Sequence, residues 1–340
     1  MNLSLEVLEL FPRHAFRIAR SGLPRYRNVI LTYEAEGVQG LGEAAPSAFY
    51  GETADSIAER LHAANEFIAG LRIRSVDDIE RAWQESWAIL APSRAAQCAL
   101  DVALWDWLAR REGVSVAELA CGAPPRPFPT FCTIGLSDAE ELEVKLAELD
   151  GFPRIKIKSD AAADLQPIRW VRERHKALLA VDANCAWGGH DLSTLSGELR
   201  RLGVTFIEQP QPPMHTLPSR NGCELPVIAD ESCVTEADIE RVAGRFDGFN
   251  IKLVKCGGLT PALRMARRGR ALGLTTMVGC MIESSLLIAA GAVVAQGTDY
   301  ADLDGAWLLG ADPFRGWTFA QGILTPPSRP GLGAERITAR

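Results

Sequence analysis

The sequence predicts an α/β fold, a modified (β/α)7β barrel of the TIM type that carries an N-terminal α+β capping domain. Five short apolar runs end in a charged residue, and successive ends are 22 to 26 residues apart, which suits one strand, one helix and two loops. Apolar runs and helical segments alternate along most of the second half. A chain of 340 residues also suits a barrel with a second, smaller domain. The five runs end at Lys158, Asp182, Glu208, Asp230 and Lys252.

Composition indicates a soluble globular protein, because 47% of the residues are hydrophobic and 23% are charged. A net charge of -7 argues against nucleic acid or an anionic membrane as a partner. The eight cysteines are scattered without a C-x-x-C pair, and no signal-like N-terminus is present, so we expect a reducing cytoplasm. The longest apolar stretches are too short or too interrupted to span a bilayer.

The first 120 residues are expected to form the capping domain. Residues 2–11 and 28–36 have the pattern of strands. Residues 40–53 (GLGEAAPSAFYGET) are rich in glycine and small side chains, which is typical of a mobile loop able to close over a site. Helical segments are predicted near 53–70, 76–90 and 93–112.

The barrel is assigned to residues 121–312, after the proline-dense segment 121–129. The residues of 313–340 carry no convincing eighth helix, and we expect this tail to fold back on the capping domain. Strands are predicted at 130–135, 154–158, 178–182, 204–208, 226–230, 249–252, 274–279 and 299–304. Helices are predicted at 139–150, within 161–176, at 262–273 and at 284–296.

Three carboxylates end three consecutive predicted strands, namely Asp182, Glu208 and Asp230. Taken singly, each suits a helix N-cap or a loop. Together they converge at the barrel mouth, where they would repel unless a divalent cation held them. Oxygen ligands without a nearby histidine favour Mg²⁺, or Mn²⁺, over zinc. His175 and His190 are expected at the surface or in loops.

Lysines stand on either side of these carboxylates in the sequence. Strand alternation places Lys156 and Lys158 on the barrel-facing side; the alternative is a frayed strand end with solvated lysines. In an eight-stranded barrel the second and sixth strands are opposed, so Lys158 and Lys252 would face each other across a substrate. Two opposed bases suit racemisation or epimerisation beside a carboxylate. Burial and two neighbouring cations, Lys156 and the metal, are expected to lower the lysine pKa. Lys255 has the wrong parity relative to Lys252 for a catalytic role.

The last predicted strand carries Asp302 and Asp304 on one face, opposite the metal site. This acidic pair suits the ammonium group of a substrate. The alternative is a turn before Gly305, since aspartate is common in turns.

A set of motifs resembles the enolase superfamily, in its muconate-lactonising subgroup. The motifs are KIK (156–158), VDAN (181–184), IEQP (207–210), ADES (229–232), NIKLVKCGGLT (250–260) and CALDVALWDWLARR (98–111). The resemblance implies one Mg²⁺ per subunit and a metal-stabilised enediolate. It implies Asp182, Glu208 and Asp230 as metal ligands, and Lys158 and Lys252 as the acid/base pair.

Within that subgroup, MVGCMIESS (277–285) and the D-x-D of YADLDG (300–305) look like dipeptide epimerases of the L-Ala-D/L-Glu type. The resemblance implies epimerisation at the α-carbon of the second residue of a dipeptide, with the ammonium group on the two aspartates, and a role in cell wall peptide metabolism. Arg25 is the expected contact for a glutamate side chain, although LPRYR (23–27) differs locally. Thr133 and Met281 complete the expected substrate-binding residues. A homo-oligomer is compatible with the resemblance.

Two other classes of function remain open. The first is another enzyme on the same scaffold: o-succinylbenzoate synthase, a cycloisomerase or an N-acylamino acid racemase. None of their substrates needs an ammonium anchor, so Asp302 and Asp304 argue against them. The second is a non-catalytic metal-binding or scaffolding protein, which would have no need of opposed lysines.

Overall fold

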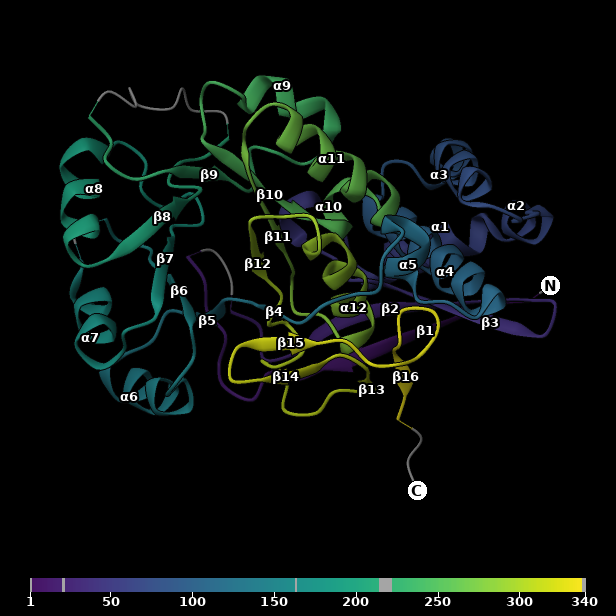
Figure 1. Cartoon of the computed structure of the whole chain (residues 1–340), viewed down its shortest axis with the longest axis horizontal. Helices are drawn as coiled ribbons and strands as arrows, with labels where there is room; N and C mark the ends of the chain where they lie inside the picture. The colour runs from purple at the N-terminus through teal and green to yellow at the C-terminus, as the bar shows by residue number, and fades with distance from the viewer. Residues whose placement is uncertain (1, 20–21, 163, 214–221, 338–340) are drawn as a thin grey trace.

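The computed structural model describes residues 2–19, 22–162, 164–213 and 222–337. An antiparallel sheet with helices packed on it lies to one side of a curved parallel sheet that is surrounded by helices (Figure 1). This confirms the predicted α/β barrel with an N-terminal capping domain. In the described part of the chain, no helix combines the length and apolar character needed to cross a membrane.

The capping domain begins with a three-stranded antiparallel sheet in the order β1-β2-β3. Its strands are β1 (Asn2–Leu10), β2 (Tyr26–Ala35) and β3 (Val38–Ala44). The helices that follow are η1 (Ala48–Tyr50), α1 (Ala54–Ala63), α2 (Asn65–Gly70), α3 (Val76–Leu90), α4 (Arg94–Glu112) and α5 (Val116–Cys121). Helix α4 is buried along nearly its whole length because it packs against both the capping sheet and the barrel helices.

The prediction of a mobile loop over residues 40–53 is wrong for its first part. Residues up to Ala44 belong to β3, which packs directly on α4. A Cβ atom on Gly42 would lie 1.9 Å from the backbone oxygen of Ala99, and one on Gly40 would lie 2.2 Å from that of Ala103. These glycines therefore permit close packing of a strand on a helix, and the sequence pattern alone does not distinguish that use from mobility.

The barrel sheet has eight parallel strands in the order β12-β11-β10-β9-β8-β7-β6-β5, as predicted. A hydrogen bond of 2.8 Å from the Phe131 amide to the Ala301 carbonyl joins the first strand to the last. The strands are β5 (Cys132–Ile134), β6 (Arg154–Lys158), β7 (Leu178–Asp182), β8 (Val204–Glu208), β9 (Val227–Ala229), β10 (Gly248–Lys252), β11 (Thr275–Gly279) and β12 (Tyr300–Asp302). The helices are α6 (Ala139–Glu148), α7 (Gln166–Arg174), α8 (Leu192–Arg201), η2 (Glu236–Asp238), α9 (Ile239–Val242), α10 (Leu253–Cys256), α11 (Leu259–Ala271) and α12 (Ser285–Ala295).

The C-terminal tail forms short strands and no helix within its described residues. Leu332 donates its amide to Asp106 of α4 at 2.7 Å, and Arg336 forms an ion pair with Glu6 of β1. The described tail therefore contacts the capping domain at these two points. Its strands are β13 (Phe314–Arg315), β14 (Thr318–Ala320), β15 (Ile323–Thr325) and β16 (Glu335–Arg336); β15 also pairs with β4 (Phe128–Pro129).

Two of the sequence motifs pack against each other where α4 meets the barrel. Asp101 accepts hydrogen bonds from the Thr260 amide at 2.9 Å and from its hydroxyl at 2.6 Å. The Trp105 indole N–H donates to the same hydroxyl at 2.8 Å. Gly258, with φ of +127°, lets the chain pass so close that a Cβ atom would lie 2.4 Å from Asp101. This contact fixes α4 of the capping domain to the start of α11 in the barrel.

Candidate active site

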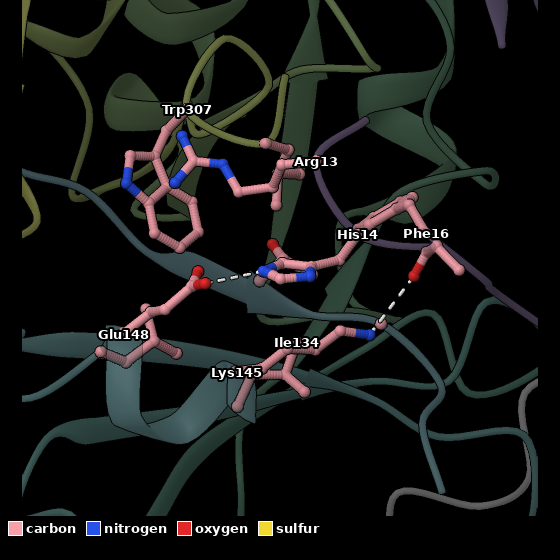
Figure 2. A pocket seen from close by; sticks show the side chains of 12 residues that line it. Arg13, His14, Phe16, Ile134, Lys145, Glu148 and Trp307 are labelled. Carbon is pink, nitrogen blue, oxygen red and sulfur yellow. Dashed lines mark hydrogen bonds and ion pairs between the residues drawn. The ribbon is translucent and has the colours of Figure 1, made fainter. Parts of the chain in front are cut away.

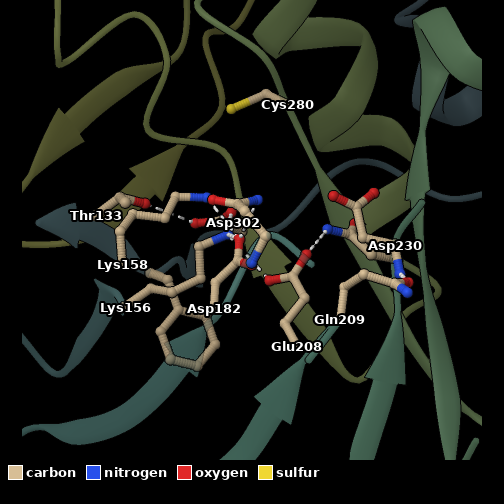
Figure 3. A network of polar contacts seen from close by, with 12 residues as sticks. Thr133, Lys156, Lys158, Asp182, Glu208, Gln209, Asp230, Cys280 and Asp302 are labelled. Atoms are coloured by element: carbon tan, nitrogen blue, oxygen red, sulfur yellow. Dashed lines mark hydrogen bonds and ion pairs between the residues drawn. The ribbon is translucent and has the colours of Figure 1, made fainter. Parts of the chain in front are cut away.

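The lysines of β6 point into the barrel, as strand alternation predicts. Ile155 and Ile157 are buried in the apolar layer beneath the helices. Lys156 and Lys158 point the opposite way, toward the barrel axis (Figure 3). The side chain of Lys156 is only 2% exposed, and that of Lys158 is 8% exposed. A frayed strand end with solvated lysines is therefore excluded.

The three predicted carboxylates lie at the ends of adjacent strands. Asp182 and Glu208 are register partners on β7 and β8, and Asp230 follows β9 directly. All three are almost fully buried. Parallel strands thus bring together groups that lie more than twenty residues apart in the sequence.

Each carboxylate is paired with a lysine ammonium group. Burial of so many charges is tolerated because the opposite charges alternate in space. Lys252, on β10, lies on the far side of the carboxylates from Lys158, with β7, β8 and β9 between their strands. The pairs are Lys158 with Asp182 at 2.5 Å, Lys156 with Glu208 at 3.2 Å, and Lys252 with Asp230 at 2.9 Å.

These pairs set the protonation of the site. Burial, reinforced by Asp182, raises the pKa of Glu208 to about 7. Burial alone would raise the pKa of Asp230, but Lys252 and Lys255 lower it well below its usual range. The expected lowering of the lysine pKa by the metal and Lys156 stays a prediction, because the carboxylates that would hold the metal act on Lys252 in the opposite direction. Burial does act to lower that pKa, but the carboxylates of Asp230 and Glu208 raise it above its ordinary value.

The residues fit a hard divalent cation by their donor chemistry. Buried carboxylate oxygens are the ligands that Mg²⁺ prefers. The buried Oδ1 of Asn250 has no hydrogen-bond partner among the described residues, while its Nδ2 donates to Glu208 at 2.7 Å. Among the described residues, no three acidic, histidine or cysteine side chains are gathered closely enough to hold a metal ion without rearrangement.

Asn184 and Gln209 hydrogen-bond to the residues that carry these carboxylates. The Asn184 amide donates to Asp182 at 2.9 Å. Gln209 accepts the amide hydrogens of Asp230 at 2.9 Å and Ser232 at 3.0 Å through its side-chain oxygen. Asn184 and Gln209 have φ of 42° and 35°, which places both in left-handed conformations directly after their strands.

Lys255 contacts Asp230 from a position that strand parity does not describe. Its strand ends at Lys252, so Lys255 lies on α10 and strand alternation does not apply to it. The buried ammonium group donates to Asp230 Oδ1 and to the Asp230 carbonyl, both at 2.6 Å. It also donates to the carbonyls of Cys233 at 2.9 Å and Asn250 at 3.0 Å. Lys255 therefore fixes the orientation of Asp230.

The acidic pair of the last strand lies across the barrel from Glu208 and Asp230. Asp302 forms an ion pair with Lys156 and accepts the Thr133 hydroxyl at 3.3 Å. Asp304 accepts the Thr133 amide at 2.6 Å. Burial, together with the charge of Asp302, raises the pKa of Asp304 to about 6. Both side chains are buried, which argues against a simple surface turn.

A cavity of about 410 Å³ lies between the barrel mouth and the capping domain. Of the expected substrate residues, Thr133 and Met281 line it. Arg25 does not, because its exposed side chain forms an ion pair with Glu9 at 2.8 Å. His190 is exposed, and His175 lies in the loop after α7, so both histidines occupy one of their two expected places, although His175 is buried. The barrel-floor residues of this cavity are Lys156, Lys158, Asn184, Asp230, Glu231, Lys252, Asp302 and Asp304.

The chain is similar to known proteins along nearly its whole length. Residues 4–120 match the mandelate racemase/muconate lactonizing enzyme N-terminal domain, and residues 138–337 match the enolase C-terminal domain-like family. An L-Ala-D/L-amino acid epimerase from Flavobacterium johnsoniae is 35% identical, over 98% of this chain and 99% of that protein. A hydrophobic dipeptide epimerase from Roseobacter litoralis is also 35% identical, over 98% of each protein.

A solved structure shares the fold as well. The dipeptide epimerase from Methylococcus capsulatus, complexed with Mg and the dipeptide L-Arg-D-Lys, is 32% identical. It superimposes with a TM-score of 0.88 and covers 98% of both chains.

Proposed function

Because the chain belongs to the mandelate racemase and muconate lactonizing enzyme family of the enolase superfamily, we propose that it is a Mg²⁺-dependent dipeptide epimerase. The reaction inverts the α-carbon of the C-terminal residue of a dipeptide. The observation that carries this proposal is the placement of Lys158 and Lys252 on opposed strands, both lining one cavity with buried carboxylates between them.

The two lysines supply a base and an acid on opposite faces of one carbon. A neutral amine on one side removes the α-proton, and the ammonium group on the other side returns a proton. When the two lysines exchange the roles of base and acid, the same site inverts a dipeptide whose α-carbon has the other configuration. The ammonium group of Lys156, held by Asp302 and Glu208, stays cationic because those carboxylates raise its pKa, although burial opposes them.

Asp182, Glu208 and Asp230 are the residues that would hold the metal. A bound Mg²⁺ would supply a counter-charge for the dipeptide carboxylate and for the enediolate that forms beside it. Gln209 and Lys255 hold Asp230 in place from behind, so the position of this carboxylate does not depend on the substrate.

Asp302 and Asp304 are the proposed binding site for the amino end of the dipeptide. They lie on the opposite side of the cavity from the proposed metal ligands and present two buried acidic groups. The α-ammonium group of a dipeptide matches this pair in charge and supplies several donors. The substrates of o-succinylbenzoate synthase, cycloisomerases and N-acylamino acid racemases have no such group, so this pair favours a dipeptide.

Proton NMR of dipeptides in D₂O with purified protein and Mg²⁺ tests the proposal. We expect the α-proton signal of the C-terminal residue to disappear while the other diastereomer appears. Lys158→Ala and Lys252→Ala should each abolish inversion, whereas Lys176→Ala, at an exposed position, should not. A variant with one lysine left can exchange the α-proton of only one diastereomer. Full inversion by either active-site variant would refute the two-base mechanism.

A further inference from the structure

The cavity has two sides of different chemistry. Its floor, at the strand ends of the barrel, carries the charged groups already described. Its cover comes from the capping domain and the loop after β11, and apart from Asn28 and Ser47 it is made mostly of apolar and aromatic side chains. The aromatic ones are Phe16, Tyr26, Phe49 and Tyr50, and the aliphatic ones include Ile18, Leu23 and Met281.

Two residues of the cover expose apolar surface next to the cavity. Leu23 is 53% exposed and Phe49 is 45% exposed. Exposed large apolar side chains that gather at a cavity mark a surface that an apolar ligand removes from water.

The cations of the floor are already engaged. Among the described lining residues, the cationic side chains are Lys156, Lys158 and Lys252. Each is bonded to at least one buried carboxylate. None of them lies on the cover, so within the described residues no cation faces a substrate side chain there.

Cationic side chains near the cover also point elsewhere. A second cavity of about 20 Å³ adjoins the first, beneath residues 13–16 (Figure 2). There Arg13 stacks on Trp307 at 4.6 Å, and His14 bonds to Glu148 at 2.8 Å. Lys145 donates to the Ala15 carbonyl at 3.3 Å. This space holds roughly one water molecule, so a substrate side chain does not fit.

The two described arginines nearest the cover in the segment that follows are likewise paired. Arg17 forms an ion pair with Glu141 of α6, and Arg25 forms one with Glu9 of β1. Neither arginine lines the main cavity. The described residues of the cover include neither a basic nor an acidic side chain, so a charged substrate side chain would lose hydration there without gaining an oppositely charged partner.

We propose that the C-terminal residue of the dipeptide substrate carries an uncharged, apolar or aromatic side chain. This inference rests on the proposed function. The reacting α-carbon must lie between Lys158 and Lys252 on the floor, so its side chain extends toward the cover. Relatives of similar sequence identity are named for dipeptides with different side chains. Sequence identity alone therefore does not predict the side-chain preference, and the residues of the cover are the basis of this inference.

The test compares four dipeptides in the D₂O assay: L-Ala-L-Leu, L-Ala-L-Phe, L-Ala-L-Glu and L-Ala-L-Lys. We expect kcat/KM for the leucine and phenylalanine dipeptides to exceed that for the charged pair by about 100-fold or more, because burial leaves the charge unpaired. Equal or faster inversion of the glutamate or lysine dipeptide would overturn this inference while supporting epimerisation. Absence of α-proton exchange with every dipeptide would overturn the proposed function and the inference with it.

A variant pair locates the specificity in the cover. Leu23→Arg places a cation at the cavity and should raise the ratio of kcat/KM for L-Ala-L-Glu over L-Ala-L-Leu by about 10-fold or more. Leu23→Met keeps the site apolar and should leave the ratio near that of the unaltered protein.

Arg20 lies outside the described residues. If the unaltered protein prefers the glutamate dipeptide and Arg20→Ala removes that preference, Arg20 serves the side chain and the inference is overturned.

Discussion

The hydrogen bonds around Thr260 predict how strongly the capping domain is fixed to the barrel. Thr260→Val replaces a hydroxyl group by a methyl group at the contact between α4 and α11. The hydroxyl now donates to Asp101 at 2.6 Å and accepts the indole N–H of Trp105 at 2.8 Å. All three residues are buried, so water cannot replace the lost partner without opening the contact.

The expected loss of folding stability follows from two groups that lose the hydroxyl as a hydrogen-bond partner, the Asp101 carboxyl group and the Trp105 indole N–H. Above about pH 8, where Asp101 is ionised in the folded chain too, loss of the hydrogen bond to its carboxylate costs ~1.5–3 kcal/mol, and leaving a buried indole N–H unpaired costs ~1–3 kcal/mol. The Thr260 amide still donates to Asp101, which limits the loss. We therefore expect the free energy of unfolding to fall by about 3–5 kcal/mol.

Equilibrium urea unfolding, followed by tryptophan fluorescence and circular dichroism, measures this loss. Thr260→Ser is the matched control, because it keeps the hydroxyl and removes only a methyl group, at a cost of about 1 kcal/mol. If the valine and serine variants unfold within about 0.5 kcal/mol of each other, the hydroxyl is not what joins the two domains, and the reasoning is refuted.

Three further predictions concern the acidic pair, the pH dependence of stability and the packing of β3. Asp304→Asn should weaken dipeptide binding at least about 10-fold while changing Mg²⁺ affinity little, as calorimetry with each ligand can measure; equal losses would indicate a structural role instead. The pKa of Asp101 is raised from 3.8 to about 7 by burial, so the folded chain keeps a proton that the unfolded chain has lost. The free energy of unfolding should therefore fall as pH rises from about 4 to about 7. Asp101→Asn should make that fall shallower in urea titrations at several pH values; an unchanged slope would contradict the raised pKa. Gly42→Ala should destabilise the protein by ~3 kcal/mol or more because its Cβ atom would collide with the Ala99 carbonyl, whereas Gly70→Ala meets open space and should be near neutral in thermal unfolding.

The sequence predicts the barrel floor well because its signals are local. A charged residue that ends an apolar run marks the end of a strand, and alternation decides which way the neighbouring side chains point. Lys156 and Lys158 follow this rule, and their isoleucine neighbours occupy the opposite layer. Parallel strand order then places Asp182, Glu208 and Asp230 side by side without further information.

Residues whose roles depend on distant partners escape this reasoning. The glycines of β3 look like loop residues until α4 is placed against them. Lys255 lies beyond the end of its strand, so parity gives no information about its bonds to Asp230. His175 is polar and lies in the loop after α7, and the sequence gives no sign that its side chain is buried there.

The division between floor and cover explains why chemistry is easier to predict here than specificity. The floor is built from strand ends, whose positions repeat at regular intervals along one part of the chain. The cover joins segments that are far apart, and buried side chains hold it in place: Asn28 donates to Glu43 at 2.7 Å and to the Ile282 carbonyl at 3.0 Å. Glu43 in turn accepts the Ser284 amide at 3.1 Å, just before α12. The wall that selects the substrate side chain therefore exists only when the capping domain docks, and a change such as Thr260→Val that loosens docking should relax the side-chain preference more than it slows proton transfer.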